Sequence, residues 1–200
     1  MELAIINGSP RPGKSNSKKY IQSFLKFFKK DCPVFTSKTD MPEKIWEGVK
    51  NATDILFVFP LYADGIPVSL LKFLKTASDF PSAKGKRVHV LINCGFFEAH
   101  QNDTAMEIID TFCRQEGFVP GCKLSIGSGE AIMDSPFAFI AKHNIKKLAK
   151  NIKNGKNTII YTSMPLTRKM FVKASTSYWL SLGRKNGITR EQMESMEIEG

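Results

Sequence analysis

The stretch that decides the fold is the apolar run LAII at residues 3–6 together with the loop GSPRPGKSNS at residues 8–17. The run has the length and continuous hydrophobicity of a strand that is buried on both faces of a sheet. After the loop, apolar side chains recur at helical spacing, at Tyr20, Ile21, Phe24, Leu25 and Phe28. A buried strand, a polar loop and an amphipathic helix in this order predict the first unit of a parallel α/β sheet.

The same alternation continues along the chain. Further strands are predicted at residues 34–35, 55–59, 88–93 and 124–126. Helical patterns lie between them, around residues 43–49, 70–74 and 105–113. Continuous apolar strands that alternate with helices are typical of a parallel sheet covered on both faces. We therefore expect an α/β fold, a three-layer sandwich of the flavodoxin kind, with a five-stranded parallel sheet in the order 2-1-3-4-5.

The loop at residues 8–17 has the chemistry of a phosphate site. Its hydroxyl and amide side chains, its two cations and the backbone N–H groups at a helix start can all donate hydrogen bonds to an anion. A plainer alternative is an ordinary turn in which Ser17 caps the helix. We favour phosphate binding because the loop offers so many donors.

The same loop also matches the Walker A pattern G-x-x-x-x-G-K-S, at Gly8, Gly13, Lys14 and Ser15. Two features speak against a nucleoside triphosphatase. The loop contains two prolines, each of which removes a backbone donor. The strands at residues 55–59 and 88–93 also lack the terminal aspartate that would hold Mg²⁺. A P-loop phosphotransferase therefore stays only as an alternative.

Two more loops leave the carboxyl ends of predicted strands, PLYADGIP at residues 60–67 and NCGFFE at residues 93–98. Ligands of open α/β sheets bind beyond these strand ends. Together with GSPRPGKSNS, the two loops resemble the NADPH-dependent FMN reductase family of flavodoxin-like NAD(P)H-dependent oxidoreductases, over roughly residues 1–150. Three loops in the right order and spacing make the resemblance more specific than any single loop.

This resemblance implies an FMN site built from the three loops. The phosphate would be held by Ser9, Arg11, Ser15, Asn16 and Ser17. The isoalloxazine ring would be flanked by Pro60, Leu61, Tyr62, Ala63, Asp64 and Gly65, and its other edge would be lined by Asn93, Cys94, Gly95 and Glu98.

The residue types suit these roles. Leu61 and Tyr62 offer an apolar and aromatic wall for the ring. Gly65 permits the backbone to reorient near flavin N5, and the turn at residues 93–95 can supply amides near N1 and O2. For Cys94 we keep the plainer interpretation of a buried thiol.

The resemblance further implies an FMN-dependent enzyme that uses NAD(P)H as co-substrate. It would reduce a small acceptor, such as a quinone, a flavin, a nitro or azo compound or a metal ion, by ping-pong hydride transfer. Since the cofactor carries the chemistry, we predict no catalytic acid or base. A flavodoxin-like electron carrier is the alternative, although such carriers are usually acidic and this chain has a formal net charge of +10.

The cysteines and histidines give no support for a metal site. The four cysteines, Cys32, Cys94, Cys113 and Cys122, are scattered and form no C-x-x-C pair. Free thiols are typical of a reducing compartment, so we expect a cytoplasmic protein without an iron–sulfur cluster or a zinc ribbon. The sequence shows neither a secretory signal nor an apolar stretch of membrane-spanning length.

Positive charge is concentrated between residues 135 and 190, which hold 12 Lys and Arg but no Asp or Glu, whereas the last ten residues hold four Glu. Without a zinc finger or an RNP motif, this segment indicates a solvated basic face, and we expect no nucleic-acid partner.

We assign residues 1–155 to an FMN-binding domain and residues 156–200 to a C-terminal extension. Residues 156–163 could be a connector or a short extra strand.

The extension contains an apolar helical stripe of Phe171, Ala174, Tyr178 and Leu182, with glycines at 183 and 187 as predicted stops. A sheet already covered by its own helices has no place for another stripe, so we predict that it packs across a two-fold axis in a homodimer. Trp179 and the neighbouring Lys and Arg leave an interfacial membrane helix as an alternative, but membrane contact is not our expectation.

Overall fold

The computed structural model describes residues 1–80 and 83–195. The chain divides into two compact units, Met1–Met164 and Pro165–Gly200. The first unit carries the sheet, and the helices of the second are α6 (Arg168–Lys185) and α7 (Arg190–Ser195). Residues 156–163, which the sequence assigned to the extension, lie in the first unit.

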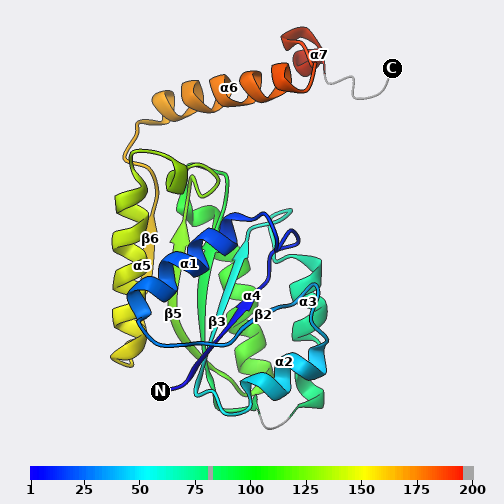
Figure 1. The fold of residues 1–200 in the computed structure, drawn as a ribbon, viewed down its shortest axis with the longest axis vertical. Helices are drawn as coiled ribbons and strands as arrows, with labels where there is room; N and C mark the ends of the chain where they lie inside the picture. The colour runs from blue at the N-terminus through cyan, green and yellow to red at the C-terminus, as the bar shows by residue number, and fades with distance from the viewer. Residues whose placement is uncertain (81–82, 196–200) are drawn as a thin grey trace. The chain divides into compact units, whose positions relative to one another are not determined.

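A six-stranded sheet forms the centre of the first unit (Figure 1). The strands follow the order β2-β1-β3-β4-β5-β6, and every neighbouring pair is parallel. Their bounds are β1 (Leu3–Asn7), β2 (Val34–Thr36), β3 (Asp54–Pro60), β4 (Arg87–Asn93), β5 (Val119–Ile126) and β6 (Ile159–Thr162). β1, β3 and β4 are buried along almost their whole length, as the continuous apolar runs predicted.

The prediction of five strands was wrong, because β6 extends the sheet beyond β5. Lys123 of β5 pairs with Ile159, and Ile126 pairs with Thr162. Along β6 the residues alternate between exposed and buried, with Ile160 and Thr162 facing the interior. A short edge strand of this kind has a weaker sequence pattern than a strand buried on both faces.

Helices cover both faces of the sheet (Figure 1). On one face, α1 (Asn16–Phe28) packs against α5 (Ala138–Lys153). On the other face, α2 (Pro42–Val49), α3 (Val68–Leu74) and α4 (Asp103–Glu116) share one apolar core, in which Trp46 stacks on Phe73 with ring centroids 4.6 Å apart. Among the described residues, 3-10 helices include η1 (Ala77–Asp79), η3 (Ala99–Asn102) and η4 (Ile132–Asp134). None of the helices in the described ranges combines the length and hydrophobicity needed to cross a membrane.

The structure decides two helix boundaries. The N-cap of α1 is Ser15, whose Oγ accepts a hydrogen bond from the Lys18 N–H at 3.2 Å, so the alternative of a Ser17 cap does not hold. The predicted stop at Gly183 was wrong. Gly183 lies within α6 and does not end it. A Cβ at Gly183 would lie 2.5 Å from the Met193 Sδ, so glycine allows α7 to pack against α6. Gly187, with a φ of 76°, follows the helix in the left-handed conformation expected after a helix end.

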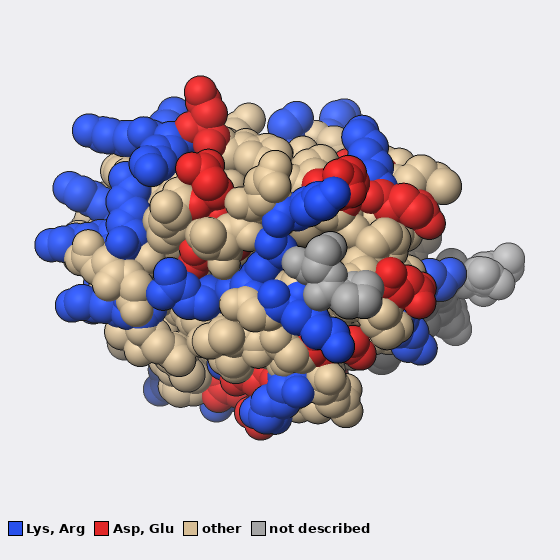
Figure 2. Space-filling model, turned by 90° about the horizontal axis from the view of Figure 1, so that it is seen from below, with Lys and Arg blue, Asp and Glu red and all other residues tan. Residues whose placement is uncertain are grey.

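Basic side chains are distributed unevenly over the surface. Figure 2 shows Lys and Arg gathered on one side of the molecule, at the left of that view. Exposed lysines lie on α1 and the segment directly after it, including Lys26, Lys29 and Lys30, and on α5, including Lys150 and Lys153. Because α1 packs against α5, lysines that are far apart in the sequence share one face of the protein.

Candidate functional site

Four loops meet beyond the carboxyl ends of the strands, because all the strands are parallel. They comprise residues 8–15 after β1, 61–67 after β3, 94–98 after β4 and 127–131 after β5. The first three were selected from the sequence, and the fourth was missed. Hydrogen bonds connect them: the Leu61 N–H donates to the Asn93 carbonyl at 2.7 Å, and the Gly129 N–H donates to the Cys94 carbonyl at 2.7 Å.

The first loop is shaped by its own side chains. Ser9 is buried, its N–H donates to the Asn7 Oδ1 at 3.0 Å, and its Oγ accepts the Arg11 N–H at 3.2 Å. Gly8 is required beneath the loop, since a Cβ there would lie 2.8 Å from the Leu70 Cδ2 and 3.0 Å from the Phe59 Cβ. The Arg11 side chain remains exposed to solvent.

The end of this loop and the start of α1 carry unused hydrogen-bond donors. In the described part of the chain, no hydrogen bond engages the backbone N–H groups of residues 13–17. Ser17 is only 1% exposed, and its Oγ has no hydrogen-bond partner among the described residues. An orphaned buried hydroxyl beside free N–H groups at the positive end of a 13-residue helix fits an anion such as a phosphate.

The second loop is a tight turn in an uncommon conformation. The Tyr62 N–H donates to the Gly65 carbonyl at 3.0 Å, and the Gly65 N–H donates back to the Tyr62 carbonyl at 3.1 Å. Ala63 and Asp64 between them have φ values of 47° and 55°. The sequence analysis attributed the conformational freedom of this loop to Gly65, but the positive φ values occur at two residues with side chains, where they are strained.

Exposed aromatic rings lie on the second and third loops. Tyr62 is 57% exposed, and Phe96, which the sequence analysis did not select, is 51% exposed. Pro60 and Leu61 are half-buried. The hydrogen bond from Leu61 to Asn93 holds the bases of these two loops together. Aromatic side chains on loops fixed in this way can provide walls for a planar ring.

The third loop offers fewer donors than its sequence indicated. Asn93 is buried, and its Nδ2 donates to the Phe59 carbonyl at 3.2 Å. The Cys94 N–H donates to the Ile126 carbonyl at 2.9 Å. Gly95 is exposed. Of the backbone N–H groups of residues 93–95, that of Gly95 makes no hydrogen bond within the described chain. Glu98 is exposed at the start of η3.

Cys94 has the properties of a structural thiol. It is 3% exposed, and burial raises the pKa of its thiol to about 11. A thiol of this kind is a poor nucleophile at neutral pH. All four cysteines are free, and the described residues contain no group of three or more His, Cys, Asp or Glu placed to hold a metal ion.

The fourth loop, residues 127–131, crosses the third loop at close range. A Cβ at Gly127 would lie 2.4 Å from the Phe97 carbonyl oxygen, and one at Gly129 would lie 2.7 Å from the Asn93 Cβ. The Glu130 carbonyl accepts a hydrogen bond from the Asn16 Nδ2 at 3.4 Å. This loop therefore connects the first loop to the third, and its only sequence signal was the pair of glycines in GSGE at residues 127–130.

No protein-family model and no curated protein matches the chain. Solved structures do match. An NADPH-quinone reductase from P. pentosaceus has a TM-score of 0.59 at 15% identity, covering 76% of this chain and 97% of that one. An FMN-dependent NADH-azoreductase from Bacillus anthracis, solved in complex with FMN, has a TM-score of 0.57 at 13% identity, covering 76% and 99%. A flavodoxin from Streptococcus pneumonia has a TM-score of 0.55 at 16% identity, covering 76% and 98%.

These likenesses define the class of the fold. The chain has a flavodoxin-like α/β fold, in which the parallel sheet carries one additional strand, β6, compared with the five strands that we predicted. At such low identity these structures indicate the fold alone. The function therefore depends on the side chains and backbone groups of the four loops.

Proposed function

We propose that this protein is an FMN-dependent NAD(P)H oxidoreductase that reduces a small acceptor, such as a quinone, a flavin, a nitro or azo compound or a metal ion. The observation that carries the proposal is the donor set at the start of α1, where the backbone N–H groups of residues 13–17 and the buried Ser17 hydroxyl have no hydrogen-bond partner among the described residues. The quinone reductase and the azoreductase of the same fold support it.

The residues of the first loop would hold the FMN phosphate. The N–H groups of residues 13–17 and the Ser17 Oγ can donate to its oxygens, and the exposed Arg11 can add a charge-assisted hydrogen bond. Ser15 and Asn16, which we also expect at the phosphate, have further contacts in the structure. The Ser15 hydroxyl caps α1, and the Asn16 side chain ties the first loop to Glu130.

The second and third loops would position the ring. Tyr62 and Phe96 can flank it, while the Gly95 N–H can donate to its polar edge. When bound, FMN would supply hydride transfer from NAD(P)H to the acceptor. The protein therefore needs no acid or base of its own, and the buried Cys94 thiol takes no part in the chemistry.

Two further aspects belong to the same proposal. The four free cysteines suit a reducing compartment, so we propose a cytoplasmic protein. The exposed apolar side chains of α6 suit burial against a second copy of the chain, so we propose a homodimer.

Spectra of the purified protein test the proposed activity. We expect a yellow protein whose absorbance near the flavin maximum is bleached by NADPH under anaerobic conditions and returns when a quinone is added. A yellow protein that does not react with NADPH or NADH would favour the electron carrier. A colourless protein that binds ATP and takes up no FMN would favour the P-loop phosphotransferase.

A further inference from the structure

A cleft with a mixed polar and apolar lining lies beside the proposed phosphate loop and outside the proposed flavin site. It has a volume of about 460 Å³ and lies between α3 and the segment that follows β2. Ser37, Lys38, Ser69, Lys72 and Thr76 are among its lining residues. The Lys38 Nζ donates to the Pro10 carbonyl at 2.7 Å, which connects the cleft to the loop at residues 8–15.

Two hydroxyl groups in the lining lack partners. The Oγ atoms of Ser37 and Ser69 are buried and have no hydrogen bond to any described residue. Thr76 differs, because its Oγ1 accepts from the Trp46 Nε1 at 2.8 Å and donates to the Phe73 carbonyl at 2.7 Å. Thr76 therefore has a structural role, whereas the two serines keep an unused donor that rotation about χ1 can turn toward the cleft.

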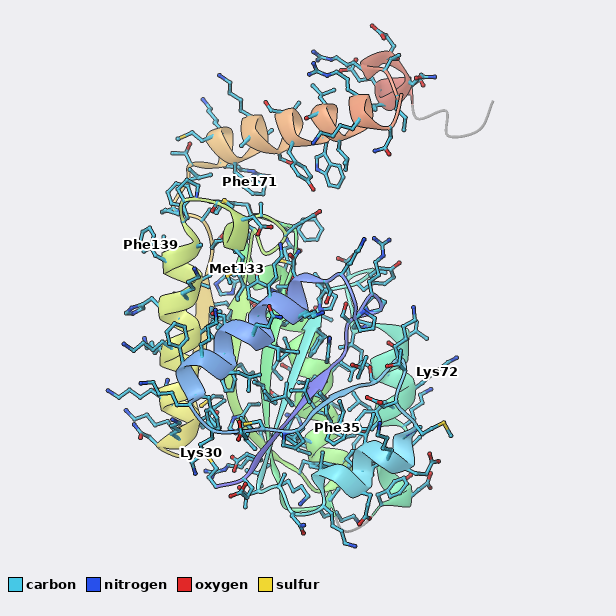
Figure 3. The ribbon with its side chains drawn as sticks, in the orientation of Figure 1. Lys30, Phe35, Lys72, Met133, Phe139 and Phe171 are labelled. Carbon is cyan, nitrogen blue, oxygen red and sulfur yellow. The ribbon has the colours of Figure 1, made fainter. Side chains whose placement is uncertain are left out.

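The charges in the lining are uncompensated. Lys72 projects from α3 (Figure 3) and forms no ion pair with the described residues. Lys38 keeps two of its three N–H donors after bonding to Pro10. The nearby Asp40 is already engaged, since its carboxylate accepts the Thr36 N–H at 2.8 Å and pairs with Lys44 at 3.1 Å. Two ammonium groups and two free hydroxyls around one cleft suit a tetrahedral anion with several acceptor oxygens.

We propose that this cleft binds a phosphate group, and that its source is the 2′-phosphate of NADPH. The identity of the source rests on the proposed function, whereas the anion site itself does not. Since the cleft adjoins the loop that would hold FMN, a dinucleotide reacting at the flavin could place its distal phosphate there. The protein would then prefer NADPH over NADH through Lys38, Lys72, Ser37 and Ser69.

Calorimetric titration of the purified full-length protein tests the site without relying on turnover. The probes are 2′,5′-ADP, 5′-AMP and inorganic phosphate. We expect 2′,5′-ADP to bind at least about tenfold more tightly than 5′-AMP, because only 2′,5′-ADP carries the 2′-phosphate. Equal affinities of the two nucleotides would overturn the proposal. Binding of inorganic phosphate as tight as that of 2′,5′-ADP would overturn the dinucleotide as the source.

Variants of single lysines test whether 2′,5′-ADP binds in the cleft. Lys72→Met should weaken 2′,5′-ADP binding by about tenfold or more, whereas Lys75→Met, an exposed lysine near the end of the same helix, should leave it unchanged. Equal losses in the two variants would indicate a general charge effect and contradict the proposed site.

Ser69→Ala adds a readout that a purely structural serine would not give. It removes a buried hydroxyl without a partner, so thermal stability should stay the same or rise while 2′,5′-ADP binding weakens. A loss of stability with unchanged affinity would assign Ser69 to packing. If the protein shows no NADPH oxidation but 2′,5′-ADP still binds as expected, the anion site stands and only the proposed redox function fails.

Discussion

At the scale of single residues, Arg11 and Lys14 separate two hypotheses about the same exposed loop. Flavin binding assigns the phosphate contact to Arg11, whereas the Walker A pattern assigns it to Lys14. We expect Arg11→Ala to weaken FMN binding by about 1.5–3 kcal/mol through loss of a charge-assisted hydrogen bond. The fold should stay intact, because the side chain is exposed.

Titration of the apoprotein with FMN, followed by flavin fluorescence, measures this effect. Lys14→Ala serves as the matched control and should bind FMN with nearly the affinity of the unmodified protein. The phosphate assignment fails if Arg11→Ala binds FMN normally, and a loss confined to Lys14→Ala would favour the P-loop hypothesis.

Asp54 is a second informative residue, at the opposite end of the sheet from the site. Its buried Oδ1 accepts hydrogen bonds from the Arg87 Nε and the His89 Nε2, both at 3.0 Å, and its Oδ2 accepts one from the Thr53 Oγ1 at 2.6 Å. Burial by itself raises the pKa of Asp54, but the hydrogen bonds and the Arg87 charge outweigh it and lower the pKa below the usual range. The ionised carboxylate therefore stabilises the fold.

This lowered pKa sets the pH dependence of stability. The contribution of Asp54 should be fully present above the unfolded pKa of about 3.9 and be lost as the pH falls through the lower folded pKa. Asp54→Ala should reduce the free energy of unfolding at neutral pH by roughly 2–3 kcal/mol, since it leaves the His89 Nε2–H without an acceptor. Urea unfolding as a function of pH measures both effects.

Asp31→Ala provides the control. Since Asp31 is exposed, its substitution should change the free energy of unfolding little. The difference in the free energy of unfolding between Asp54→Ala and the unmodified protein should become smaller at the lowest pH at which the protein still folds. A difference that stays constant down to that pH would contradict the assigned role.

At the scale of elements, the turn at residues 62–65 stores strain. Ala63→Gly should raise the free energy of unfolding by about 0.5–1 kcal/mol, because glycine adopts a positive φ without the steric cost that alanine has. Gly65→Ala is the matched control and should be nearly neutral, since the nearest atom to a Cβ there is 3.9 Å away. Urea denaturation of both variants tests the difference.

The same pair of variants tests whether the turn changes conformation with the flavin redox state. With FMN bound, Ala63→Gly should shift the midpoint potential measured by dye equilibration, whereas Gly65→Ala should leave it unchanged. A shift of the midpoint potential in Gly65→Ala alone would indicate that the conformational change occurs at Gly65.

At the scale of the whole molecule, α6 carries several exposed apolar side chains that a partner could cover. Gly183 is its one buried residue, while Met170, Val172, Tyr178, Trp179 and Leu182 are between 38% and 55% exposed. We expect the full-length protein to be a dimer at micromolar concentration and the double variant Trp179→Ser, Leu182→Ser to be a monomer, as measured by light scattering. Lys173→Ala is the control and should remain dimeric.

A monomeric full-length protein would contradict this prediction. Binding of that monomer to anionic vesicles would favour the interfacial membrane helix instead. A truncation intended to remove the extension should end after Met164, because an earlier end at residue 157 would also remove β6.

Much of this protein could be predicted from local sequence. The apolar runs at residues 3–6, 55–59 and 88–93 predicted three central strands, because strands buried on both faces of a sheet are apolar along their whole length. The loops at residues 8–17, 60–67 and 93–98 were selected because they follow those strands. Their involvement in FMN binding stays a prediction.

Other features depended on which distant segments become neighbours. Gly183 lies within α6 because the close packing of α7 leaves no room for a side chain there. Residues 159–162 form a strand because they pair with β5. The loop at residues 127–131 became part of the site because it crosses residues 93–97, and Ser37 and Lys72 share a cleft because α3 packs beside the end of β2. Local sequence thus determined the elements, since hydrophobic periodicity is a short-range property. The tertiary structure alone decided which polar groups remain without partners, because that depends on long-range packing.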